Sequence, residues 1–154
     1  MTLDATKPTD QELVSALPAY IRAVATEVNS LIAGVTDIVK TDLSVSAGDT
    51  ALVVGTDLSD ANLEIVLASG LGAATLDQIR GGTEGQIKIF IFQNNNLSMK
   101  DGAKSTGQLY LNQLPVLSTL NAQEDDVIAF VNIDGDGAST YGYWKEIFRQ
   151  ISVK

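Results

Sequence analysis

Between residues 14 and 38, apolar residues recur at alternating steps of three and four, which is the core pattern of a heptad repeat. Pro18 suits the first position of a helix and Gly34 suits its end, so a helix is predicted over residues 18–33. β-branched residues at both core positions favour three strands over two, so the stripe predicts a trimeric coiled coil. Its interface consists of the residues in strict register: Ile21, Val24, Val28 and Leu31.

A second interpretation of this helix stays open. The positions that flank a heptad core usually carry charges, but here they are Tyr20, Ala25, Glu27 and Ile32. The helix is therefore also consistent with an amphipathic element that lies on its own domain or on a partner. Under both interpretations, residues 1–40 form an N-terminal helical segment for attachment or oligomerisation.

After residue 40 the helical pattern gives way to short alternating runs separated by Gly, Asn and Asp, which are typical of strands and turns. No stretch from residue 41 onward has a helical pattern of useful length. The fold class predicted for residues 41–154 is mainly β, as an antiparallel β-sandwich or a jelly-roll-like domain. The predicted strands are 42–46, 50–54, 62–67, 75–79, 86–93 and 127–133.

The strand predicted over residues 86–93 is apolar on both faces, with isoleucines on one side and phenylalanines on the other. Residues 127–133 repeat this pattern. An antiparallel strand with one face in water would alternate apolar with polar residues, so two apolar faces favour a contact between subunits. The predicted β interface consists of Ile87, Ile89, Phe90, Ile91 and Phe92.

Composition narrows the functional classes. The chain has 154 residues, 45% of them apolar, which is enough for one domain with a core. No apolar run is long enough to span a bilayer, and the N-terminus lacks the layout of a signal peptide. A net charge of −9 argues against nucleic acid and anionic membranes as partners. The chain has no Cys and no His, so disulfides, thiolate nucleophiles and the commonest general base are excluded.

Two acidic segments resemble chemical motifs, but a simpler interpretation fits each better. Residues 132–137 have the opening spacing of a calcium loop, but Tyr143 replaces the glutamate at the twelfth position, so a hairpin turn is predicted. Asp125 and Asp126 are adjacent and would point to opposite faces of a strand, so a solvated turn is predicted there. We therefore expect a non-enzymatic protein without catalytic residues, metal or cofactor.

Aromatic residues close to the C-terminus have two interpretations. Tyr141, Tyr143 and Trp144 could contact a glycan, because aromatic rings stack on sugar rings. Alternatively they belong to a core strand that places Trp144 and Phe148 on its inner face. The second interpretation is favoured, and the first keeps a host surface glycan among the candidate partners.

An ordered series of segments resembles the C-terminal β-domain of virion proteins of tailed bacteriophages, namely tail fibres and spikes, head fibres and capsid decoration proteins. The opening of the chain is similar to N-terminal segments of such proteins. These stretches lie toward both ends of the chain, within residues 3–22 and 81–149. The segments are 3–10, 17–22, 81–89, 100–102, 107–112 and 142–149.

The resemblance implies a homotrimeric component on the surface of the phage particle, with the N-terminal part attached to capsid or tail proteins and the β-domain facing outward. The shortness of the chain favours a head-fibre or decoration role. The alternative is a tail-fibre or adaptor component whose β-domain binds a glycan receptor. Proteins of this type share no catalytic residues in these segments, so none is transferred to this chain.

Overall fold

The computed structural model describes residues 38–112, 118–138 and 140–151, which form strands and no helix. The prediction of a mainly β domain is confirmed. The predicted helix over residues 18–33, with Ile21, Val24, Val28 and Leu31, lies outside the described residues. The strands are β1 (Ile38–Val45), β2 (Ala51–Val53), β3 (Leu63–Gly70), β4 (Ala74–Leu76), β5 (Gln78–Arg80), β6 (Ile87–Phe92), β7 (Leu97–Lys100), β8 (Leu109–Tyr110), β9 (Thr119–Asn121), β10 (Val127–Gly135) and β11 (Tyr141–Gln150). β1 thus begins before the domain boundary predicted at residue 41.

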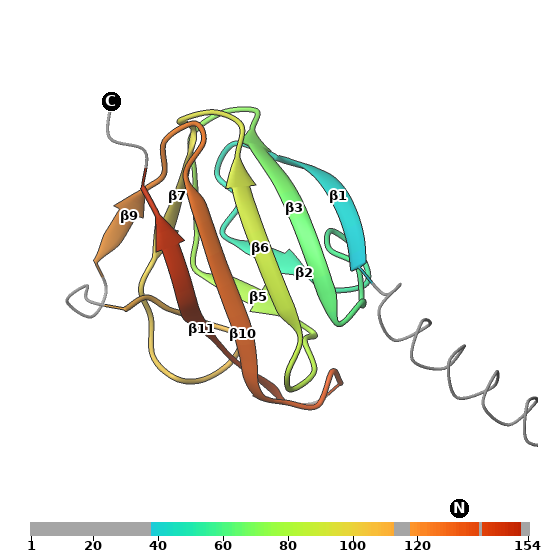
Figure 1. Ribbon diagram of the computed structural model, residues 1–154. Coiled ribbons are helices and arrows are strands. Elements are labelled where there is room, and N and C mark those ends of the chain that lie inside the picture. Colours follow the sequence, from blue (N-terminus) through green and yellow to red (C-terminus); the bar gives the residue numbers. More distant parts are fainter. Residues whose placement is uncertain (1–37, 113–117, 139, 152–154) are drawn as a thin grey trace, which may run out of the picture. The chain divides into compact units, whose positions relative to one another are not determined.

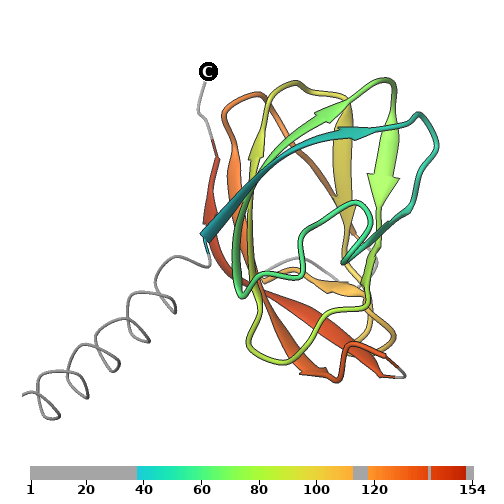
Figure 2. The same ribbon diagram turned by 90° about the vertical axis from the view of Figure 1, so that its right-hand side faces the viewer.

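The described strands form one large sheet and two small ones. The large sheet has the order β1-β3-β6-β10-β11-β8, and the small sheets are β2-β5 and β4-β7-β9. Figure 1 looks onto the large sheet, with β2, β5 and β7 behind it. Figure 2 shows the layers from the side. The described body is therefore a two-layer β structure.

The prediction of an antiparallel sandwich is wrong in its strand directions. β3 lies between β1 and β6 and pairs with both of them in parallel. Among the described ladders, only three are antiparallel: β10 with β6, β10 with β11, and β7 with β9. Parallel neighbours need a long crossover connection. Residues 46–62 and 71–86 provide these crossovers, because they carry β2, β4 and β5 through the second layer before the chain returns to the large sheet.

The core lies between the layers. Val66, Phe90, Phe130 and Trp144 of the large sheet have no exposed surface. The rings of Phe90 and Phe130 meet edge to face, with centroids 6.1 Å apart and an interplanar angle of 79°. The small sheets contribute Leu52, Leu76, Ile79, Leu97 and Met99.

The β10–β11 hairpin contains two irregularities that determine where its side chains point. The register shifts between Ala129 and Phe130, so that Ala129 faces Phe148 whereas Phe130 faces Glu146. Such a bulge adds one residue to a strand, so the side chains beyond it point to the opposite face. Gly142 has a φ of +58°, and a Cβ there would lie 2.1 Å from the carbonyl oxygen of Ile133, so only glycine fits.

Candidate functional site

The outward face of the large sheet is apolar across its three central strands. Most residues that point outward from β3, β6 and β10 are aliphatic, with Ser69 near the end of β3 as a polar exception. An exposed sheet face normally carries many more polar side chains. We call this surface the sheet face. It consists of Leu63, Ile65, Leu67, Ile87, Ile89, Ile91, Val127, Ala129 and Val131.

Strand register brings these residues into three rows. Ile89 lies at the centre, paired with Ile65 of β3 on one side and Ala129 of β10 on the other. The rows on either side are Leu63–Ile87–Val131 and Leu67–Ile91–Val127. Ala129 is buried by its neighbours and the other eight residues are partly exposed. The sheet face is thus one continuous apolar surface of the described body.

The border of the sheet face is mixed in character. On the β1 side lie Ile38, which is 51% exposed, and the surface ion pair of Lys40 with Asp42. On the β11 side lies Phe148, which is 52% exposed beside Ala129. The inward position expected for Phe148 is wrong, because the bulge in the hairpin turns this ring outward. Phe148 therefore enlarges the apolar surface.

The β interface predicted from the sequence is only partly available. Phe90 and Phe92 are completely buried in the core of their own chain, so their inclusion in a subunit interface is wrong. The reason is that the second layer covers the inner face of β6. Ile87, Ile89 and Ile91 point outward and are partly exposed, so they remain candidates for contact with another molecule.

A buried ion pair lies on the opposite side of the same strands. Lys88 Nζ is 2.7 Å from a carboxylate oxygen of Glu64, and both side chains are fully buried. Lys88 also donates to the carbonyl oxygens of Ser59 and Ala61, at 2.6 and 3.2 Å. Glu64 accepts from the Ser59 N–H at 2.8 Å and from the Thr41 hydroxyl. This network ties β1, β3 and β6 to the loop before β3, which is a structural role.

The predicted aromatic glycan contacts are separated by the structure. Trp144 is completely buried and its indole N–H donates to the carbonyl oxygen of Ile79 at 2.9 Å, so its inclusion in a glycan site is wrong. The reason is that Trp144 points inward from β11, between the layers. Tyr141 and Tyr143 point to the other face of β11 and are partly exposed.

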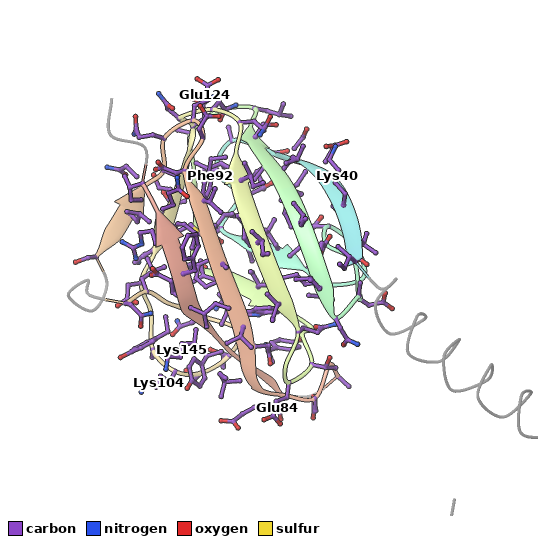
Figure 3. The ribbon with its side chains drawn as sticks, in the orientation of Figure 1. Lys40, Glu84, Phe92, Lys104, Glu124 and Lys145 are labelled. Carbon is purple, nitrogen blue, oxygen red and sulfur yellow. The ribbon has the colours of Figure 1, made fainter. Side chains whose placement is uncertain are left out.

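Tyr143 belongs to a cluster that the sequence did not reveal. Its ring meets that of Tyr110 edge to face at 6.2 Å, and Lys104 Nζ lies 4.8 Å from the centre of the Tyr110 ring. Lys145 is the register partner of Tyr110 on β8. Figure 3 shows Lys104 and Lys145 at the same corner of the body. The only signal in the sequence was the Gly-Gln-Leu-Tyr segment, which gives no sign of pairing with β11.

The acidic segments form turns. Asp136 Oδ1 accepts from the N–H groups of Ala138 and Thr140, and the Asn132 side chain bonds to backbone groups of Gly135 and Tyr141. The hairpin predicted there is confirmed. The turn predicted at Asp126 is also present, but Asp126 is buried and accepts from the Gln123 N–H, so it is not solvated.

Comparisons with protein-family models, curated proteins and solved structures find no match to this chain. Within the described residues there is no group of three or more side chains placed to bind a metal ion. The same part of the chain contains no helix long and apolar enough to cross a membrane. The sheet face and the tyrosine cluster are the two surfaces of the described body that could contact another molecule.

Proposed function

We propose that this protein is a non-enzymatic structural component of a bacteriophage particle that associates with two further copies of itself. The observation that carries the proposal is the sheet face. Large continuous apolar surfaces on soluble proteins mark sites of contact with other molecules. The resemblance of the chain to head-fibre and decoration proteins supports a particle surface as its location and capsid or tail proteins as its partners.

A second copy is the occupant that the sheet face fits best. Adjacent outward residues lie about 4.8 Å apart across strands and about 6.8 Å apart along them, so three rows on three strands form a compact patch. A stable interface buries about 800 Å² on each partner and is most apolar at its centre. The sheet face supplies such a centre, and Phe148 and Ile38 enlarge it.

Three copies of this surface pack around a threefold axis in the proposed assembly. The heptad stripe predicted over residues 18–33 supports three chains over two, and closed symmetry prevents growth into open filaments. The N-terminal segment attaches the trimer to the particle. Weak contacts of single trimers then add up over a lattice through multivalency.

Light scattering coupled to size exclusion tests the self-association directly. We expect about three chains per particle at micromolar concentration. Ile89→Lys is expected to lower the molar mass below that of the parent at the same concentration, with unchanged far-ultraviolet circular dichroism, because assembly would bury an unpaired charge at the centre of the contact. The measurement is the molar mass of each variant under identical conditions.

Leu71→Lys is the matched control, since Leu71 is 73% exposed and lies outside the sheet face. This variant is expected to remain trimeric. A monomeric parent protein would contradict the proposal, as would an Ile89→Lys protein that assembles like the parent. Immunogold labelling of purified phage particles with an antibody against this chain then tests the location. Particles that carry no gold label would contradict it.

A further inference from the structure

Three cationic side chains lie around the tyrosines at one end of the described body: Arg80, Lys104 and Lys145. All three are exposed, and none forms an ion pair with a described residue. The chain as a whole has a net charge of −9, so unpaired cations gathered in one place contrast with the rest of the protein. Such a cluster favours an anionic ligand over a neutral one.

The tyrosines supply flat surfaces beside these charges. Tyr143 and Lys145 are two residues apart on β11 and share a face of that strand, and Tyr141 precedes them on the other side of the irregularity at Gly142. The rings of Tyr110 and Tyr143 hold each other edge to face at 6.2 Å. Within the described residues, none of the three phenol oxygens has a hydrogen-bond partner, so each is available to a ligand. Tyrosine combines an apolar ring face with a polar end, which suits ligands that are part apolar and part polar.

A hollow of about 370 Å³ adjoins this cluster. Arg80 Nε donates to Gln78 Oε1 at 2.9 Å, so its terminal N–H groups remain available to a carboxylate. Loop 103–107 connects the hollow to the ring pair, because Thr106 lines the hollow while Lys104 lies over Tyr110. The volume falls in the usual range of small-ligand pockets. The hollow is lined by Gln78, Arg80, Thr106, Thr140 and Tyr141.

We propose that this corner binds an acidic saccharide, with a sugar ring against Tyr141, its carboxylate on Arg80, and the saccharide continuing toward Tyr110 and Tyr143. Hydroxyl groups of Thr106 and Thr140 and the amide of Gln78 match the polar edge of a sugar. Three cations suit a ligand with sparse charge, whereas the dense phosphates of a nucleic acid are repelled by a chain of net charge −9. This role does not depend on assembly through the sheet face.

An array of carboxylated, sulfated and neutral oligosaccharides tests the proposal with the full chain. We expect carboxylated members to bind, and calorimetry with sialyllactose and a hyaluronan tetrasaccharide to show affinities at least tenfold above that for lactose. Arg80→Gln and Tyr141→Ala are each expected to weaken binding at least tenfold, while Tyr141→Phe retains most of it. An unchanged melting temperature shows that each variant is folded.

Lys40→Gln is the control, because it removes one exposed positive charge at the opposite edge of the large sheet (Figure 3). It is expected to bind like the parent. The absence of binding to any member of the array would overturn the proposal. It would also be overturned if neutral saccharides, or a single-stranded oligonucleotide, bound as tightly as the carboxylated saccharides. If free acetate or sulfate displaced the saccharide as well as a carboxylated saccharide does, the result would indicate a site for an adventitious ion only and would also overturn the proposal.

Discussion

Replacing Lys88 by methionine is expected to lower the free energy of unfolding by about 3–5 kcal/mol. The substitution leaves the Glu64 carboxylate buried without the ammonium group that lies 2.7 Å from it. It also removes the donor to the carbonyl oxygens of Ser59 and Ala61. Urea denaturation measures the loss as a lower midpoint at an unchanged slope.

A second substitution separates the charge effect from lost packing. In the double variant Lys88→Met/Glu64→Gln, the amide oxygen still accepts from the Ser59 N–H and the Thr41 hydroxyl, and no charge is left alone. We expect this protein to regain most of the stability, because neutral replacements of buried ion pairs are often well tolerated. Equal losses in the single and double variants would contradict the role given to the ion pair.

Replacing Trp144 by alanine is expected to cost about 3–5 kcal/mol, which is typical of a large aromatic residue removed from a core. Trp144 is completely buried, contacts the backbone at Gly82 and bonds to the Ile79 carbonyl oxygen. Trp144→Phe keeps part of the volume, so a smaller loss is expected. Thermal unfolding followed by circular dichroism measures both.

Leu71→Ala serves as the surface control, since Leu71 is 73% exposed and its loss is expected to change stability by about 0.5 kcal/mol or less. If Trp144→Ala were as stable as Leu71→Ala, the result would contradict a core role for Trp144. The expected instability also has a practical consequence, because lost ligand binding in Trp144→Ala would report unfolding. Tyr141 is therefore the proper position for testing the saccharide site.

Much of the strand content could be predicted from alternation of apolar residues. The strand predicted over residues 86–93 is β6 at Ile87–Phe92, and that predicted over 127–133 lies within β10. Alternation is local, so it identifies a strand without identifying the strands that pair with it.

The sequence nevertheless contained one long-range signal. Glu64 and Lys88 are single charges at inward positions of two apolar strands, and they are register partners. Recognising that pair would have predicted that β3 and β6 are neighbours, although one pair does not determine whether two strands run parallel or antiparallel.

The site was harder to predict because it depends on irregular features. Phe148 points outward only because of the bulge between Ala129 and Phe130, which leaves no clear mark in the sequence. Tyr110 and Tyr143 meet only because the short strand β8 pairs with β11. Phe90 and Ile89 are equally apolar in the sequence, and only the presence of a second layer decides that one is core and the other is surface.

The arrangement of β6, β10 and β11 has a consequence for how the body folds. β10 lies between β6 and β11 in the middle of the large sheet, although it comes late in the chain. The β10–β11 hairpin is a local contact, whereas joining β3 to β6 requires the chain first to pass through the second layer. Topologies dominated by such distant pairings fold slowly, on the scale of milliseconds to seconds. A nascent chain that has not yet released β10 from the ribosome therefore presents an open edge on β6, which makes late synthesis the stage most vulnerable to aggregation.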